Sequence, residues 1–259
     1  MPAPRTLIGA IVQRLLPTPF VDDRDSDRPA RAARYGELFG LNPIRKQHLL
    51  ADEGSYFVTN NAQTGIASPA VAVFGATTPL AIVANTDTVS ASAKRIYLDY
   101  MTMVTTAAGS FASAGVNLQL AVYIDGVDRY TSGGTDISTN IVSPNMDVSA
   151  RSSVAKVRFG NITATAATGA VRAICGLRIL RPVVSAVVAD VIGETKQLNF
   201  GAVENTMNGN IVVANANNIP LPLPPIIIGP QQCALIYYIM NGTTPAAASY
   251  APEIAWWER

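Results

Sequence analysis

The sequence predicts an all-β protein: a jelly-roll-like β-sandwich preceded by an N-terminal arm that contains short helices. From about residue 56 onward the 259-residue chain is rich in Val, Ile, Thr and Tyr. These residues occur in short runs separated by Gly, Asn and Pro, as in strands joined by turns. About eleven such runs follow one another without a helical pattern between them, which favours a sandwich. We therefore expect an arm over residues 1–55 and a sandwich domain over residues 56–259.

The arm carries two helical patterns. Residues 4–16 have apolar side chains spaced four apart and stop at Pro17, which is typical of a short amphipathic helix. In the second pattern Asp27 suits the N-cap, Pro29 the first turn and Gly40 the C-terminal end. The apolar positions of the two helices are Leu7, Ile11 and Leu15, and then Tyr35, Leu38 and Phe39. Helices this short are marginal alone in water, so these faces need either the chain's own sandwich or a neighbouring subunit.

The strands are predicted from the apolar runs and their punctuation. They cover residues 68–74, 80–85, 94–104, 116–124, 127–130, 154–162, 170–180, 196–203, 211–214, 233–240 and 254–257. Asp125-Gly126 lies between two of these runs, the first strictly alternating, and predicts a type I′ hairpin. The Pro-rich segment 219–230 cannot be a central strand, so we expect an edge strand or an arm that lies on a neighbour.

Long stretches of the chain carry no charge. Residues 59–86 and residues 205–252 contain no Asp, Glu, Lys, Arg or His, although about a quarter of a solvated surface is normally charged. These stretches mix Ala, Val and Ile with Thr, Asn, Gly and Pro. We expect them to be buried against other subunits, which predicts a homo-oligomer with threefold as the expected order.

A search for catalytic chemistry points away from an enzyme. His48 is the one histidine and lies in the arm, so a Ser-His-Asp or Cys-His pair would have to use it. The chain contains no Gly-x-Ser-x-Gly, P-loop or Gly-x-Gly-x-x-Gly motif. Asp125 and Asp128 could bind Ca²⁺ across the predicted hairpin, but a solvated turn is the simpler interpretation. We predict no catalytic residue, no metal and no cofactor.

Other binding classes are also disfavoured. No stretch reaches the roughly 20 apolar residues of a membrane-spanning helix. Residues 1–50 hold eight basic and five acidic residues, too small an excess for a nucleic-acid-binding tail. Cys175 and Cys233 each lie in an apolar run, where two buried thiols are expected; a disulfide between them stays open.

Trp256 and Trp257 are adjacent near the C-terminal end of the sequence. In a strand their rings point to opposite faces, so one enters the core and the other, Trp257, can enter an interface. A platform on which sugars stack is the alternative.

Two stretches carry a resemblance to a known class of proteins. They are ARYGELFGLNPIRKQHLLADEGSYFVTNNAQTGIA (33–67) and IPLPLPPIIIGPQQCALIYYIMNGTTPAAASYAPEIAWWER (219–259). Together they resemble structural proteins of tailed-bacteriophage virions, in which a helical arm leads into a β-sandwich. The resemblance implies a minor virion component assembled in the host cytoplasm.

The sequence therefore predicts a non-enzymatic capsid decoration or cement protein. Its partners would be further copies of itself and the phage major capsid protein or other virion proteins. The predicted assembly contacts are Leu7, Ile11, Leu15, Tyr35, Leu38, Phe39 and Trp257. A jelly-roll coat protein of a small virus and a tail or receptor-binding component that binds carbohydrate are the alternatives.

Overall fold

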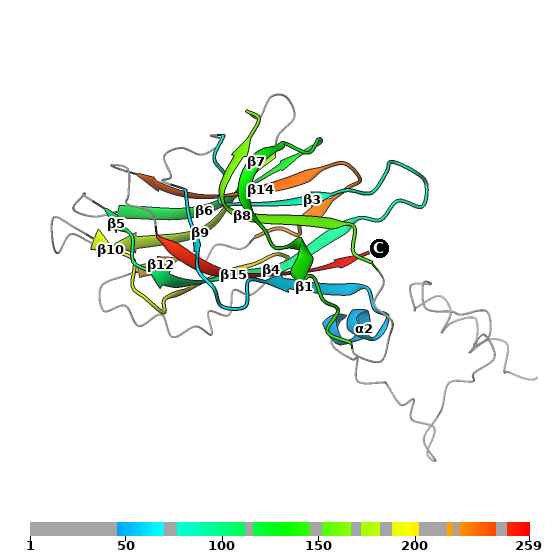
Figure 1. Ribbon diagram of the computed structural model, residues 1–259, viewed down its shortest axis with the longest axis horizontal. Coiled ribbons are helices and arrows are strands. Elements are labelled where there is room, and N and C mark those ends of the chain that lie inside the picture. The colour runs from blue at the N-terminus through cyan, green and yellow to red at the C-terminus, as the bar shows by residue number, and fades with distance from the viewer. Residues whose placement is uncertain are drawn as a thin grey trace, which may run out of the picture. The chain divides into compact units, whose positions relative to one another are not determined.

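Figure 1 shows the computed structural model of the chain. It describes residues 46–69, 77–111, 116–145, 152–166, 172–181, 188–201, 217–219, 223–241 and 248–259. The chain divides into two compact units, residues 1–46 and 47–259. The helices predicted at residues 4–16 and 29–39 lie outside the described residues. The first described element is the short helix α2 (Lys46–Asp52), which leads into the strands.

The first sheet is built around the C-terminal strand β15 (Ser249–Glu258). Within the described residues its order is β1 (Tyr56–Asn60), β15, β4 (Ile96–Ala107) and β11 (Thr195–Asn199). The short strands β2 (Ile66–Ala67) and β13 (Ile227–Ile228) pair with β15 and β4, respectively. Every pairing in this sheet is antiparallel.

β14 (Cys233–Asn241) lies at the middle of the second sheet, between β6 (Val116–Asp125) and β3 (Ala81–Asn85), both of which are more than 100 residues before it in the chain. In the described part of the chain the order of this sheet is β12 (Asn217–Ile219), β9 (Arg172–Arg181), β6, β14, β3, β8 (Ala155–Ala164) and β7 (Tyr130–Asp136). The pairings are again antiparallel. A separate ladder joins β5 (Ser110–Phe111) to β10 (Val188–Ala189). A 3₁₀ turn, Ser138–Asn140, follows β7.

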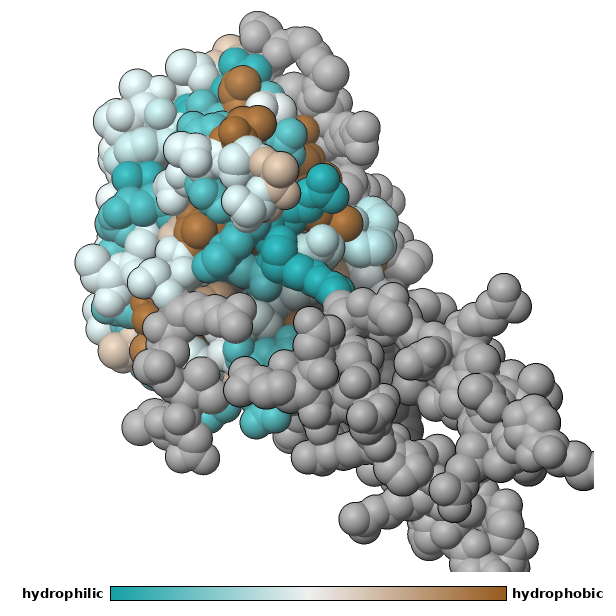
Figure 2. All heavy atoms as spheres, turned by 90° about the vertical axis from the view of Figure 1, so that its right-hand side faces the viewer, coloured by the Kyte–Doolittle hydropathy of each residue, from teal (hydrophilic) through white to brown (hydrophobic). Residues whose placement is uncertain are grey.

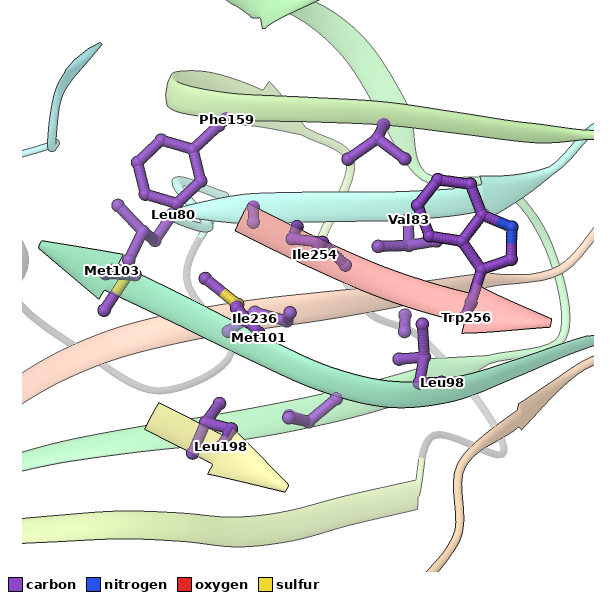
Figure 3. Close-up of a cluster of buried hydrophobic side chains, with 14 of the residues drawn as sticks. Leu80, Val83, Leu98, Met101, Met103, Phe159, Leu198, Ile236, Ile254 and Trp256 are labelled. Atoms are coloured by element: carbon purple, nitrogen blue, oxygen red, sulfur yellow. The ribbon is translucent and has the colours of Figure 1, made fainter. Parts of the chain in front are cut away.

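The main core lies between the two sheets. Figure 3 shows side chains of β15, β4 and β11 directed toward those of β3, β8 and β14. The labelled residues are Leu80, Val83, Leu98, Met101, Met103, Phe159, Leu198, Ile236, Ile254 and Trp256, all of them buried. Burying each large aliphatic side chain contributes roughly 1.5–3 kcal/mol. The predicted all-β sandwich is therefore confirmed, while the jelly-roll connectivity stays a prediction.

A second, smaller core lies on the opposite face of β3 and β14. Ile82 and Leu235 alternate along their strands with residues of the main core, so they point away from it. There they pack with Ile162 of β8. β8 reaches this face beyond Gly160, whose φ of 101° is a conformation that favours glycine. β3 and β14 are consequently buried on both faces.

Most predicted strands are present. Eight of them overlap observed strands. β3, β4, β6, β8, β9, β11, β14 and β15 correspond, in this order, to the predictions at 80–85, 94–104, 116–124, 154–162, 170–180, 196–203, 233–240 and 254–257. The predictions at 211–214 and over most of 68–74 fall outside the described residues. The strand predicted at 127–130 is wrong, because the chain between Asp125 and Tyr130 is a loop.

The predicted hairpin at Asp125-Gly126 is also wrong. β6 pairs with β9 on one edge and β14 on the other, so no edge of β6 remains for β7. β7 instead pairs with β8 at the end of the second sheet. The Asp125 side chain is buried and bonds the loop, accepting from the Val127 amide and the Arg129 guanidinium. The Asp125 side chain therefore stabilises the loop that connects β6 to β7.

The Pro-rich segment forms edge structure on its own domain. β12 lies at one end of the second sheet, and β13 adds to β4 beside the main path of the first sheet. Between them Leu223 bridges Phe200, and both side chains are buried. The prediction that residues 219–230 are not a central strand is confirmed for the described residues. They form edge strands, as one of the two expected alternatives had it.

Candidate functional site

Trp257 lies on the solvent side of the first sheet, one residue after the buried Trp256. β15 is flanked by β1 and β4, so Trp257 stands in the middle of three strands. Trp256 is fully buried and packs 6.2 Å from the Phe57 ring, centroid to centroid. Trp257 points the other way and is partly exposed. The predicted division of the two rings between opposite faces is confirmed.

Three aromatic residues form a row across the strands, which we call the aromatic row: Tyr56, Trp257 and Tyr97. The antiparallel register pairs Trp257 with Tyr56 on β1 and with Tyr97 on β4. The rings of Tyr97 and Trp257 stack with centroids 5.3 Å apart and planes 4° apart. Such a row offers a large, rigid contact area with few side-chain torsions to immobilise.

Two carboxylates lie next to the aromatic row. The Tyr56 hydroxyl donates to Asp99 over 2.8 Å, and the Tyr100 hydroxyl donates to Glu253 over 2.7 Å. Burial, and then the hydrogen bond to the carboxylate, raises the pKa of each tyrosine well above its ordinary value. Both phenols therefore stay protonated and donate at neutral pH, which fixes the orientation of the carboxylates.

We call these six residues together the outer face: Tyr56, Tyr97, Asp99, Tyr100, Glu253 and Trp257. Apart from Tyr56, their side chains are neither buried nor fully exposed. Each carboxylate has two oxygens and more acceptor sites than one phenol fills. The outer face can therefore stack against a flat or apolar group while accepting hydrogen bonds or a positive charge from it.

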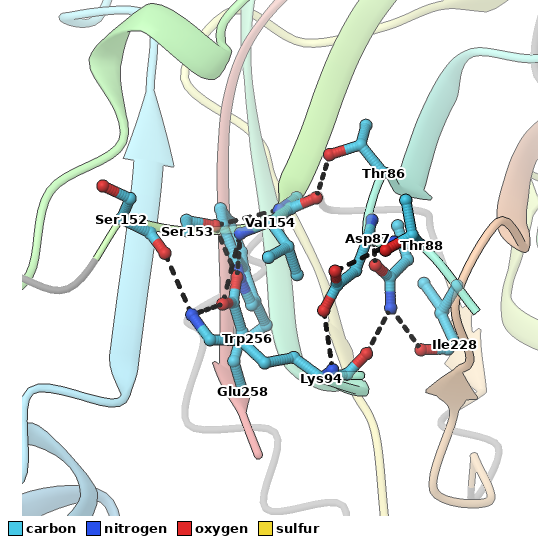
Figure 4. A network of polar contacts seen from close by, with 12 residues as sticks. Thr86, Asp87, Thr88, Lys94, Ser152, Ser153, Val154, Ile228, Trp256 and Glu258 are labelled. Atoms are coloured by element: carbon cyan, nitrogen blue, oxygen red, sulfur yellow. Dashed lines mark hydrogen bonds and ion pairs between the residues drawn. The ribbon is translucent and has the colours of Figure 1, made fainter. Parts of the chain in front are cut away.

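Glu258 fixes the end of β15 and so places both tryptophans. Its carboxylate accepts from the Trp256 indole N–H at 3.1 Å and from the Val154 amide at 3.0 Å. Ser153 donates through its hydroxyl, and Lys94 forms an ion pair with it over 3.4 Å. Figure 4 shows Lys94 and Ser153–Val154, from two loops distant in sequence, meeting Trp256 of the same strand at the Glu258 side chain.

Two strands of the charge-free stretches, β3 and β14, are buried within this subunit. β14 lies in residues 205–252 and is buried continuously over residues 233–238. β3 lies in residues 59–86, and all five of its residues are buried. Both strands have a core on each face. In the described part of the chain, the absence of charge in these two strands therefore reflects burial within this subunit.

The remaining predicted residues are placed as follows. Leu7, Ile11, Leu15, Tyr35, Leu38 and Phe39 lie outside the described residues. Cys233 is a buried free thiol whose Sγ donates to the Val127 carbonyl, so it is not paired with Cys175. Burial raises the pKa of Cys233 to about 12, which leaves the thiol protonated and unreactive at neutral pH.

The described residues contain no group of three or more His, Cys, Asp or Glu that could hold a metal ion. Within the same residues, no helix has the length and hydropathy to span a bilayer. At the end of the sandwich near the C-terminus, Figure 2 shows apolar side chains scattered between polar ones. The large apolar residues exposed on the described surface are Val89, Val127, Val142, Val191, Ile192 and Ile227.

Sequence reasoning identified Trp257 but missed the other five residues of the outer face. The signal was present in part: in residues 96–107 polar and aromatic residues alternate with buried apolar ones. The pairing of β4 with β15 was not readable, because these strands are about 150 positions apart in the chain. Comparisons with protein families, curated proteins and solved structures found no match for this chain.

Proposed function

We propose that this protein is a structural component of a virion, a capsid decoration or cement protein that acts without catalysis. It assembles as a homo-oligomer, with a trimer as the expected form, and binds the major capsid protein or other virion proteins. The outer face is the observation that carries this proposal. The resemblance of residues 33–67 and 219–259 to tailed-phage virion proteins supports the same assignment.

The composition of the outer face suits an interface between proteins. Tyr and Trp are enriched at the centres of protein interfaces, where they supply most of the binding energy. The stacked pair Tyr97 and Trp257 is already ordered, so little side-chain entropy is lost on binding. Asp99 and Glu253 add acceptors that set the orientation of a partner.

The test is the assembly state of the full chain at micromolar concentration, measured by sedimentation. We expect a multimer that dissociates when Trp257 and Tyr97 are both changed to Ala. Val89→Ala is the matched control, because this apolar residue is 80% exposed on the loop between β3 and β4. A wild-type chain that stays monomeric under these conditions would contradict self-assembly through this face. Copy number in purified particles then separates decoration, coat and tail roles.

A second candidate is a carbohydrate-binding component of a tail or receptor-binding protein. A flat stacked aromatic pair beside two carboxylates also matches the way proteins bind sugars, with the ring stacked and the hydroxyls hydrogen-bonded. Glycan binding by the wild-type chain that is lost in Trp257→Ala and retained in Val89→Ala would favour this candidate. A jelly-roll coat protein of a small virus remains the third candidate, which copy number would identify.

A further inference from the structure

A buried ionic cluster occupies one end of the sandwich core, and the proposed function does not use it. It consists of Asp190, Glu194 and Lys196, which lie in and just before β11. The alternation of β11 turns Lys196 inward, opposite in direction to its exposed neighbours Thr195 and Gln197. The three side chains have relative exposures of 0%, 1% and 0%. A lysine in such a position is rare unless it is paired.

The amine of Lys196 lies beside both carboxylates. Its Nζ is 3.5 Å from an oxygen of Asp190 and 3.7 Å from an oxygen of Glu194. It also donates to the Thr105 hydroxyl over 3.1 Å. The segment that carries the two acids is held against β4 by backbone hydrogen bonds. The Asp190 N–H donates to the Gly109 carbonyl, and the Thr105 N–H donates to the Glu194 carbonyl. Backbone hydrogen bonds therefore hold the segment that carries Asp190 and Glu194 in place beside Lys196.

Tyrosines surround the Asp190 carboxyl. The Tyr250 hydroxyl donates to one of its oxygens, and the Tyr238 hydroxyl lies 3.4–3.5 Å from both. The two rings meet edge to face, and Nζ of Lys196 lies 4.9 Å from the centre of the Tyr250 ring. Burial raises the pKa of Tyr250 far above its ordinary value, so its hydroxyl remains a donor. Two hydrogen-bond donors thus face the oxygens of one carboxyl.

The fully ionised cluster would place two negative charges and one positive charge in the core. Burying three charges is costly even when they are paired, and the net charge of −1 adds to this cost. Condensing the ammonium with one carboxylate removes both of their charges and leaves a neutral amide. Condensation therefore lowers the number of buried charges from three to one, the one left being the Glu194 carboxylate, so the net charge of −1 is unchanged.

We propose that Lys196 and Asp190 form an intramolecular isopeptide bond, with Glu194 as the proton relay. Glu194 takes a proton from the ammonium and passes it to the Asp190 carboxylate, and the free amine Nζ attacks Cγ of the resulting carboxylic acid. Tyr250 and Tyr238 donate to the oxygen that becomes negative, as in an oxyanion hole. The C–O bond breaks, and both protons lost from Nζ leave on the departing oxygen as water. Glu194 ends in the protonation state in which it began, and no further reactant is consumed.

Proximity lowers the barrier to a bond that does not form between free side chains in water. Well-oriented groups held in one structure react with effective molarities of about 10⁵–10⁸ M. Here a tight turn holds the side chains in their orientation. The Glu194 N–H donates to the Val191 carbonyl, and the Gly193 N–H donates to the Thr105 carbonyl. The bond would tie this turn to the first residues of β11 at the edge of the first sheet.

The experiment is the intact mass of the purified, folded full-length chain. We expect a mass below that of the sequence by one water, about 18 Da, because condensation expels it. Tandem mass spectrometry should locate the link between Lys196 and Asp190. Lys196→Met should restore the full sequence mass, and Asp190→Asn should lose ammonia, about 17 Da, to give the same bond. A folded wild-type chain with the full sequence mass after prolonged incubation would overturn the proposal.

Two variants separate the chemistry from a change in folding. Glu194→Gln keeps the size of the side chain and leaves both bond-forming residues in place, so its bond should form at least tenfold more slowly. An unchanged rate in this variant would overturn the role of Glu194. Lys156→Met is the matched control: Lys156 pairs with Asp136 over 2.7 Å, but both are more than a third exposed. It should keep the loss of one water, and a full sequence mass in this control would count against Lys196 as the reacting amine.

Discussion

At the residue scale, the two adjacent tryptophans show how a single position along a strand decides what a side chain does. Trp256 fills the main core and donates its indole N–H to Glu258. Trp257 stacks on Tyr97 on the outer face. The alternation of the strand separates them, and the antiparallel register supplies a different set of neighbours to each.

Substituting each tryptophan should therefore have different consequences. Trp256→Ala removes a fully buried ring and should lower the free energy of unfolding by about 3–5 kcal/mol. Trp257→Ala removes a partly exposed ring and should cost about 1 kcal/mol. Urea denaturation followed by circular dichroism measures both. Equal losses in the two variants would contradict the assignment of one ring to the core and the other to the surface.

Gly160 is the second position where one residue determines the local structure. Its φ is 101°, and a Cβ there would lie 2.6 Å from Ile66 Cγ2 and 2.9 Å from the Ala67 carbonyl. Gly160→Ala should therefore lower the stability by about 2 kcal/mol or more, from strain and overpacking. Gly193→Ala is the control, because its φ is also positive but its Cβ would meet nothing within 4 Å. It should cost about 1 kcal/mol, from the backbone conformation alone.

The comparison of the two alanine variants is made by thermal unfolding. If Gly160→Ala were no more destabilising than Gly193→Ala, the close approach of a Cβ to Ile66 and Ala67 would add nothing to the cost of the positive φ that both glycines share.

At the element scale, β15 is anchored by contacts beyond its own ladder. Glu258 bonds two loops and the indole of Trp256, while Glu253 on the same strand bonds a tyrosine on the outer face. The first carboxylate is buried and the second is not. A buried acceptor leaves its donors unsatisfied when it is removed, whereas water can replace an exposed one.

Glu258→Ala should consequently destabilise the strand more than Glu253→Ala. We expect a loss of about 2–4 kcal/mol for Glu258→Ala, because the buried Trp256 N–H and the partly buried Val154 N–H lose their acceptor. Glu253→Ala should cost under about 1 kcal/mol. Hydrogen exchange of the β15 amides should be faster in the first variant at the end near residue 258. Equal protection in both variants would show that the ladder alone holds this end.

At the scale of the whole molecule, the second sheet is covered on both sides at its centre. β3 and β14 contribute alternate residues to the main core and to the smaller core beside β8. This arrangement buries β3 and β14, which lie in the two charge-free stretches, within one subunit. Self-association is therefore expected through the outer face of the first sheet, where aromatic and acidic side chains are accessible.

The arm prediction belongs to this scale as well. Deleting residues 1–26 should leave the melting temperature of the remaining chain within about 3 °C, since exposed polar linkers tolerate truncation. The same deletion should abolish incorporation into particles, because Leu7, Ile11 and Leu15 then no longer dock. Calorimetry and particle composition measure the two effects. Unfolding of the truncated chain would show that the arm packs on its own sandwich, and normal incorporation would show that the first helix has no assembly role.

The all-β class, most strand positions and the opposite directions of Trp256 and Trp257 follow from the sequence alone. Each rests on a local pattern, since alternation and composition report how one segment divides between a buried and an exposed side. The non-central position of residues 219–230 is local for the same reason, as proline cannot donate to a central ladder.

Only the tertiary structure decided which strands are neighbours. The Asp125-Gly126 turn reads as a hairpin, but β9 and β14 occupy both edges of β6, so β7 pairs elsewhere. The aromatic row joins residues from strands far apart in the chain, and Thr105, Tyr238 and Tyr250 come from distant strands to meet the cluster around Lys196. Pairing depends on which strand edges remain free after all others have paired, and no local pattern carries that information.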